Sequence, residues 1–323
     1  MSARPKKALS GDEILSSQRG PSGPYLSFSD QDIFDALDLS RPGLASMREA
    51  VDTGDADMAF SAWGRYWAGR TEPNYAFDRD RSGYHPDLDR VILAEADRVL
   101  ADDFCYRTLK PKRKGLAFEL VYQLDTDDYF GFMSMYYIRD LGPAWQISGD
   151  DRYAECLQAL ILNFVEQLPD IAEHASSTDP RSGHVWDGLQ LIWNDGLSSS
   201  IRTWFLLDAY WTVRTSDVLS AACHRACLRL FLGQSRYVFD QGIQEFSDDN
   251  FQATRCRWLM SAGVFLPEFK ESGAWADAAL RNLEPRIRGY MEDGMQAEQC
   301  MQYHLAGLND ILIQLFLLDA NAR

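Results

Sequence analysis

The sequence lacks the features that mark nucleic-acid-binding and membrane-spanning proteins. Its 323 residues carry 32 lysines and arginines against 48 aspartates and glutamates, a formal net charge of −16. Such a surplus of negative charge opposes binding to a phosphate backbone. The longest apolar run, ILIQLFLLDA, is far shorter than the about 20 residues that a membrane-spanning helix needs. We therefore expect no nucleic-acid partner and no membrane partner.

Several short motifs are also missing. There is no CxxC pair, no zinc-like spacing, no glycine-rich phosphate loop, no GxSxG and no HExxH. We expect no metal, no cofactor and reduced thiols on apolar helix positions. The six cysteines are Cys105, Cys156, Cys223, Cys227, Cys256 and Cys300.

The N-terminal stretch MSARPKKALSGDEILSS is charged, and no apolar segment follows it as in a signal peptide. We expect a cytoplasmic protein, or a periplasmic or secreted one if the natural N-terminus differs. Residues 1–25 are rich in Ser, Gly, Pro and Lys and predict a mobile tail, which leaves 26–323 as one domain. The one basic run, KPKRK at 110–114, is either a solvated loop or a local landing site for an anionic polymer.

Helical periodicity dominates the rest of the chain. In RYAECLQALILNFVEQL (152–168), apolar side chains recur at i, i+3 and i+4, with a polar face opposite. Alternation typical of a strand is scarce, and FCYRTL (104–109) is the clearest example. The pattern predicts an all-α fold of antiparallel hairpins, arranged as a bundle, a solenoid or a closed ring. Similar stripes cover 56–69, 86–101, 131–147, 197–213, 217–232, 251–264, 274–291 and 302–319.

Aromatic side chains are numerous and suit either a sugar-binding cleft or a packed core. They include Trp63, Tyr66, Trp67, Trp186, Trp193, Trp204 and Trp211. His184 and Trp186 precede an expected helix, WDGLQLIWND, whose Gln190, Asn194 and Asp195 would line a wet cavity or a solvated stripe.

Two polar segments near the C-terminus could carry chemistry. Ser247-Asp248-Asp249-Asn250 opens the 251–264 helix, with Asn250 as its expected N-cap. Arg255 and Arg257, one to two turns on, could meet an anion or offset nearby acidic residues. In DGMQAEQCMQYH (293–304), Gln296, Glu298, Tyr303 and His304 flank the start of the last helix, for a structural or a catalytic reason.

Taken together, two blocks resemble the heparinase II/III family of polysaccharide lyases. They are NFQATRCRWLMSAGVFLPEFKESGAW (250–275) and DGMQAEQCMQYH (293–304). DLSRPGLASMREAVDTGDADMAFSAWGRYW and ISGDDRYAECLQALILNFVEQL give weaker support upstream. The resemblance covers roughly 35–323 and is to the family's N-terminal domain, of the alginate-lyase-like type. It implies an incomplete (α/α) toroid whose hairpins curve around a groove.

The resemblance also implies a reaction and roles for residues. Family members cleave uronic-acid polysaccharides by β-elimination, in which the C5 proton leaves and the 4-O-linked sugar is expelled. Asn250 matches the Asn that neutralises the substrate carboxylate, and Tyr303 matches the catalytic base. Ionising a phenol at pH 7 costs about 4 kcal/mol, so donors such as His304, Arg255 or Arg257 are expected nearby. Arg255, Arg257, Gln296, Glu298, Trp193 and His304 are the expected substrate-binding residues. One sugar residue must touch both Asn250 and Tyr303, so we expect their side chains within about 10 Å of each other.

The chain departs from the family pattern at three points. The His of the family's Asn-His pair is Phe251, the family's Glu-x-x-x-Arg helix reads DGLQLIWND, and the chain stops at Arg323, before the family's further toroid helices and C-terminal β-sandwich domain. Three functions therefore stay open. They are a lyase or its N-terminal portion, a catalytically silent helical domain that binds an anionic glycan or a partner chain, and a plain helical scaffold. The polymer itself is not predicted.

Overall fold

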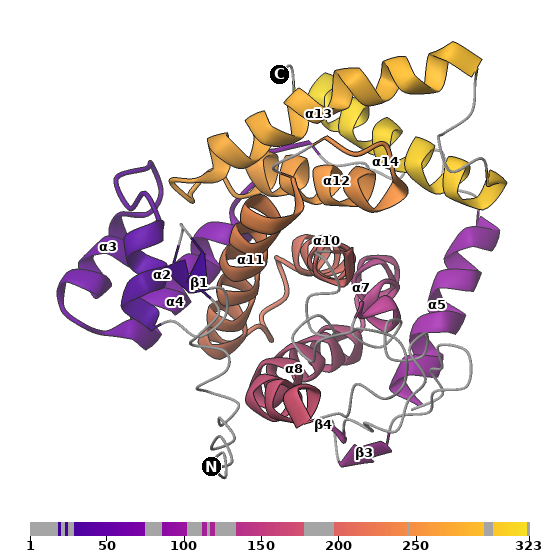
Figure 1. Ribbon diagram of the computed structural model, residues 1–323. Coiled ribbons are helices and arrows are strands. Elements are labelled where there is room, and N and C mark those ends of the chain that lie inside the picture. The colour runs from indigo at the N-terminus through magenta and orange to yellow at the C-terminus, as the bar shows by residue number, and fades with distance from the viewer. Residues whose placement is uncertain are drawn as a thin grey trace, which may run out of the picture.

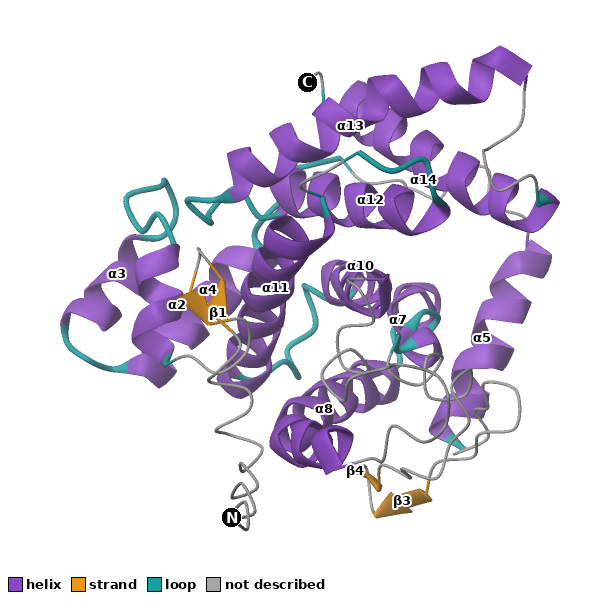
Figure 2. Ribbon diagram, viewed as in Figure 1, coloured by secondary structure: helices purple, strands orange, loops and turns teal. Residues whose placement is uncertain are grey.

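α-Helices make up most of the computed structural model, which describes residues 19–20, 23–24, 29–74, 86–101, 112–114, 117–119, 134–177, 197–243, 246–293 and 300–321 (Figures 1 and 2). The all-α prediction is therefore confirmed. The helices are α2 (Asp30–Ala36), α3 (Ala45–Asp52), α4 (Ala56–Ala68), α5 (Pro86–Leu100), α7 (Leu141–Ser148), α8 (Asp151–Ser177), α10 (Leu197–Thr212), α11 (Ala221–Gly242), α12 (Asn250–Phe265), α13 (Ser272–Asp293) and α14 (Met301–Ala320). In the part of the chain that the structure describes, no helix is long and apolar enough to cross a bilayer.

Strands are confined to two short antiparallel pairs within the described residues. β1 (Arg19–Gly20) pairs with β2 (Gly23–Pro24), inside the predicted tail. β3 (Lys112–Lys114) pairs with β4 (Ala117–Glu119), so three residues of the basic run form a strand and not a loop. FCYRTL lies outside the described residues.

Helix boundaries differ from the periodicity in three places. A continuous helix over 131–147 was wrong, because Met135 takes a left-handed φ of 53° and a 3₁₀ turn (Tyr136–Ile138) precedes α7. Pro143 falls in the first turn of α7, where a missing backbone N–H costs nothing. α8 continues past Pro169 to Ser177, and α11 starts at Ala221 and ends ten residues after the predicted stop at 232.

α10 and α12 lie at the centre of the fold. Fourteen of the 16 residues of α10 and 13 of the 16 residues of α12 are buried. A helix that is buried all round needs small residues where neighbours approach closely. At Gly263 of α12, an added Cβ would lie 2.6 Å from the Ala276 Cβ and 2.8 Å from the Ser272 carbonyl oxygen. Glycine therefore lets α13 approach α12 closely.

The tryptophans that suggested a sugar cleft form part of the core. Trp63, Trp67 and Trp211 are fully buried. Trp67 stacks on Trp63 and on Tyr210, with ring centroids 5.9 and 5.0 Å apart, and meets Trp211 edge-on at 5.2 Å. For these three tryptophans the packing alternative holds.

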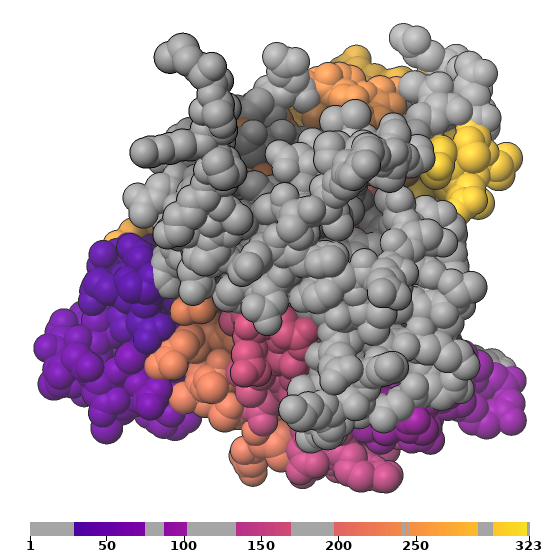
Figure 3. Space-filling view, turned by 60° about the horizontal axis from the view of Figure 1, so that its bottom comes forward, coloured from indigo at the N-terminus to yellow at the C-terminus, as the bar shows by residue number. Residues whose placement is uncertain are grey.

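The Pro267-Glu268-Phe269 segment after α12 ties the first helices to the last ones. The carboxylate of Glu268 accepts a 2.6 Å hydrogen bond from the Tyr66 hydroxyl, and its carbonyl accepts one from the Asp38 N–H at 2.7 Å. Burial beside Glu268 raises the pKa of Tyr66 to about 12, so this phenol stays protonated as a donor. In the space-filling view the first helices, α2 to α4 (indigo to purple, left), and the last helix (yellow, right) lie on opposite flanks (Figure 3).

Candidate functional site

Asn250 is the first residue of α12, and its neighbour caps the helix. The side chain of Asp249 accepts a 2.7 Å hydrogen bond from the Gln252 N–H. The predicted N-cap role of Asn250 was therefore wrong by one residue, because aspartate is an equally good cap and stands one position earlier. Because Asp249 provides the N-cap hydrogen bond of α12, capping does not explain why an asparagine stands at position 250.

Tyr303 and His304 lie in the first turn of α14. The helix begins at Met301, and the His304 N–H donates to the Cys300 carbonyl at 2.8 Å. Tyr303 keeps 43% of its surface exposed, whereas His304 is half-buried. The phenol is therefore accessible, at a helix end that carries a partial positive charge.

α12 and α14 run in the same direction. The C-terminal end of α12 lies against Arg70, whose Nη1 donates to the Phe265 carbonyl at 2.7 Å. The C-terminal end of α14 lies against Asn74, whose side chain donates to the Ala320 carbonyl at 3.0 Å. Both helices thus end beside residues 70–74 and begin at the opposite side, and α13, which connects them along the chain, runs in the opposite direction (Figure 1). Asn250 and Tyr303 consequently share one end of the helix pair.

Buried hydrogen bonds fix how far α12 and α14 are shifted along their axes relative to each other. Asp310 of α14 accepts hydrogen bonds from the Thr254 hydroxyl at 2.7 Å and from Arg257 Nη1 at 3.0 Å. Asn250 lies four residues before Thr254 and Tyr303 seven before Asp310, which is about 6 to 10 Å toward the N-terminal end on each helix. Packed helix axes lie about 8 to 10 Å apart. Helix geometry therefore puts the two residues at about the same level on neighbouring helices.

Arg257 was predicted to bind substrate, but its side chain does not face solvent. Its side chain is 5% exposed and forms the ion pair with Asp310, and its guanidinium lies over the Trp204 ring. Burial raises the pKa of Asp310, and the charge of Arg257 opposes that shift. Arg257 is turned inward because the buried carboxylate of Asp310 needs a cation beside it.

The other predicted residues divide into two groups. Arg255 is half-buried on α12, and Phe251 is 36% exposed directly after Asn250. Gln296, Glu298, Trp193, His184 and Trp186 lie outside the described residues. Among the described residues no group of three or more His, Cys, Asp or Glu side chains could hold a metal ion.

Sequence reasoning missed Asp310 and Arg286. Asp310 is the one charged residue within LAGLNDILIQLFLL, and a lone charge in an apolar helix signals a buried pair. Arg286 of α13 is 1% exposed and binds the segment that leads into α12. Its sequence context, EPRIRGY, gives no sign of that burial.

Comparison with known proteins gives a consistent family relationship. Residues 33–323 match the family model described as heparinase II/III N-terminus. The "heparin-sulfate lyase" of Bacteroides thetaiotaomicron is 23% identical over 314 residues, covering 90% of this chain and 41% of that protein. The "heparin-sulfate lyase" of Pedobacter heparinus is 24% identical over 298 residues, covering 86% and 41%.

Solved structures show the same fold. A crystal structure of heparinase III superposes with a TM-score of 0.71 at 20% identity, covering 91% of this chain and 44% of that one. A crystal structure of heparan sulfate lyase HepC from Pedobacter heparinus gives a TM-score of 0.61 at 20% identity, covering 92% and 44%. The predicted incomplete (α/α) toroid is confirmed. The chain spans less than half the length of these relatives.

Proposed function

Because the chain belongs to the heparinase II/III family through the N-terminal domain that it matches over residues 33–323, we propose that it carries the proton-transfer site of a polysaccharide lyase. The reaction is β-elimination on a uronate-containing glycan. The observation that carries the proposal is the parallel start of α12 and α14, which brings the first turns holding Asn250 and Tyr303 to one end of the helix pair.

The two residues divide the chemistry between them. A uronate C5 proton is weakly acidic because the adjacent carboxylate is negatively charged. A hydrogen bond from the Asn250 amide to that carboxylate stabilises the charge that develops as the proton leaves. The Tyr303 phenolate takes the C5 proton, the C4–O bond breaks as the C4–C5 double bond forms, and the phenol returns its proton to the leaving oxygen.

Local electrostatics support an anionic ligand at this end of the molecule. The chain as a whole is strongly negative, with a net charge of −16. The N-terminus of α14 at Met301 carries a partial positive charge, whereas the Asp249 carboxylate already caps the N-terminus of α12. His304 and Arg255, both half-buried, lie within one or two turns of these two helix starts and add donors. These groups favour an anion locally on a chain that is negative as a whole.

For the substrate class we propose a heparan-sulfate-type glycosaminoglycan. The support is that the relatives carry the name heparin-sulfate lyase. Alginate and hyaluronan are the competing polymers, since both contain uronate and would satisfy the same Asn-Tyr chemistry. More than half of each relative lies outside the part that this chain matches, and we propose that a partner domain corresponds to that part.

The test measures binding and turnover separately. Calorimetry should detect binding of heparan sulfate oligosaccharides, whereas absorbance of the unsaturated uronate product should show little or no turnover by this chain. The physical reason for weak turnover is Phe251, which stands where the family has an imidazole and can neither donate nor accept a proton. One positioned acid–base group is worth about 10² to 10⁴ in rate.

Phe251→His is the matched gain-of-function variant. Because Phe251 is partly exposed, the imidazole can be accommodated, and we expect turnover to rise by about 10²-fold, the lower end of what a positioned acid–base group contributes. Tyr303→Phe should abolish whatever turnover is present without changing oligosaccharide affinity by more than a few-fold. No binding to any uronate polymer would refute the proposed function. Turnover that survives Tyr303→Phe would refute the role of the phenol.

A further inference from the structure

Arg286 is a charged side chain on the middle of α13 that is almost fully buried. Its Nη1 donates to the Asp249 carbonyl at 2.9 Å, and its Nη2 donates to the Ser247 carbonyl at 2.7 Å and to Gln252 Oε1 at 3.1 Å. The Asp248 carboxylate lies 3.5 Å from Nη1. Within the described residues, every hydrogen-bond and ion-pair partner of Arg286 belongs to segment 247–252. Asn250 lies inside that segment.

The same segment is cross-linked internally. Gln252 Oε1 also accepts the Ser247 N–H at 2.7 Å, and the Gln252 N–H is the one that Asp249 caps. Arg286 donates to the carbonyls of both Ser247 and Asp249. The Asp249 carbonyl also accepts the Ala253 N–H at 3.3 Å, whereas for the Ser247 carbonyl Arg286 is the donor that the described residues supply. The guanidinium thus links the start of the turn to the start of α12.

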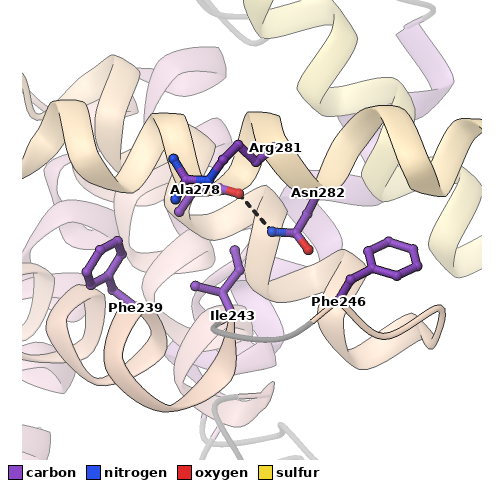
Figure 4. A pocket seen from close by; sticks show the side chains of 6 residues that line it. All are labelled: Phe239, Ile243, Phe246, Ala278, Arg281 and Asn282. Carbon is purple, nitrogen blue, oxygen red and sulfur yellow. Dashed lines mark hydrogen bonds between the residues drawn. The ribbon is translucent and has the colours of Figure 1, made fainter.

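Packing around the guanidinium confines it. The Phe246 ring lies with its centroid 5.6 Å from the Arg286 guanidinium carbon. The same ring forms one wall of a cavity of about 240 Å³ between α11 and α13, which Asn282 lines one helical turn before Arg286 (Figure 4). One turn after Arg286, on the same face of α13, Gly289 makes room for Asp248, since an added Cβ would lie 3.2 Å from its Oδ2. The turn is thus packed along one face of α13.

We propose that Arg286 is the positioning residue of Asn250: by fixing the 247–249 turn from α13, it sets where the Asn250 amide meets the substrate carboxylate. This inference rests on the function proposed for Asn250. A displacement of about 1 Å at a reacting group can cost about 10²-fold in rate. Arginine is required because its planar fork serves three acceptors in fixed directions, whereas a lysine ammonium is a single point charge.

The experiment compares Arg286→Lys with Arg288→Lys. Arg288 lies two residues further on α13, is exposed, and pairs only with Glu284 among the described residues, so its substitution changes the same chemical group at the surface. The first readout is the NMR signal of the Asn250 side-chain amide, identified by its loss in Asn250→Ala. We expect Arg286→Lys to shift it and Arg288→Lys to leave it unchanged.

The second readout is a double-mutant cycle on heparan sulfate oligosaccharide binding, or on turnover in the Phe251→His background. Arg286→Lys should weaken binding or turnover about 10- to 100-fold. In the Asn250→Ala background it should have no further effect, because the residue through which it acts is gone. If Arg286→Lys does not fold, Gln252→Met, which removes one acceptor of Arg286, should shift the Asn250 signal in its place.

The outcomes separate the two proposals. An unchanged Asn250 signal in Arg286→Lys, or additive effects in the cycle, would overturn the positioning role. Absence of oligosaccharide binding by the unmodified chain would overturn the proposed function. In that case the Asn250 signal would still decide the positioning role, because its measurement needs no ligand.

Discussion

At the residue scale, a buried ion pair holds the two site helices in register. Asp310→Asn would leave the Arg257 guanidinium buried without its anion. We expect a loss of about 3 to 5 kcal/mol in the free energy of unfolding, because a buried charge that loses its partner keeps its desolvation cost. Urea unfolding measures this. Asp319→Asn, an exposed site on the same helix, should change stability by less than about 0.5 kcal/mol. Equal effects at both sites would contradict the buried pair.

A second prediction at this scale concerns His224. Burial lowers its pKa to about 4, against an ordinary value of 6.5, and its Nδ1 lies 2.6 Å from the Tyr210 hydroxyl. Between these two pH values the unfolded chain binds a proton that the folded chain does not. The contribution of His224 to stability is therefore complete above about pH 6.5 and is lost as the pH falls to about 4. The full loss is about 3 kcal/mol.

The measurement is the free energy of unfolding between pH 4 and pH 8 for the native chain and for His224→Gln. The variant is less stable at neutral pH because it loses packing beside Tyr210. Its stability should nevertheless fall less steeply on acidification than that of the native chain. Parallel pH profiles for the two proteins would show that His224 is not the group that titrates.

At the element scale, close contact between α12 and α13 depends on one glycine. Gly263→Ala puts a methyl group 2.6 Å from the Ala276 Cβ, so one helix must shift. We expect a loss of about 1 to 3 kcal/mol, as for other overpacked sites. Gly273→Ala is the matched control, since an added Cβ there meets nothing within 4 Å. Gly273 is the second residue of α13, so that substitution should stabilise by less than the about 0.5 to 1 kcal/mol of a mid-helix site. Thermal unfolding measures both, and equal signs would contradict the close approach.

At the scale of the whole molecule, the last helix presents an apolar side to solvent. Five of its large side chains are exposed on one side, namely Met301, Leu305, Leu312, Leu315 and Phe316, while the exposed Tyr303 lies two turns before Asp310 on the other side. The opposite side of α14, with Gly307, Asp310, Ile311, Gln314 and Leu317, is buried. A contiguous apolar surface of this kind promotes association in water.

Replacing Leu312 and Phe316 together by glutamate should reduce this association. We expect less binding of an apolar fluorescent dye and a smaller apparent mass in light scattering at high protein concentration. Folding stability should change by less than about 1 kcal/mol, because both side chains are already exposed. Leu280→Glu, on an exposed position of α13, is the control and should have little effect. Unchanged dye binding in the double variant would mean that the surface of α14 is not the apolar patch.

Local patterns predicted the elements well, because helical periodicity is a property of residues three and four apart. The stripes at 56–69, 86–101, 251–264, 274–291 and 302–319 each became a helix with bounds within about two residues. The same reasoning failed at 131–147, where Pro143 marked a helix start that the apolar stripe concealed. The family resemblance, which depends on residue identities at a given spacing, was also readable from the chain alone.

Tertiary structure decided which of the candidate residues share a site. Arg255 and Arg257 are neighbours in the sequence and were predicted to act together. Arg257 pairs with Asp310, 53 residues further on, only because α14 packs against α12 in the folded chain. The contact of the C-terminal ends of α12 and α14 with residues 70–74, far away in sequence, likewise exists only in the folded chain. The burial of Arg286 depends on the turn at 247–249, which α13 reaches only in the folded chain. Helix type and position are set by neighbours along the chain, whereas the partner of a buried charge is set by whichever element packs against it.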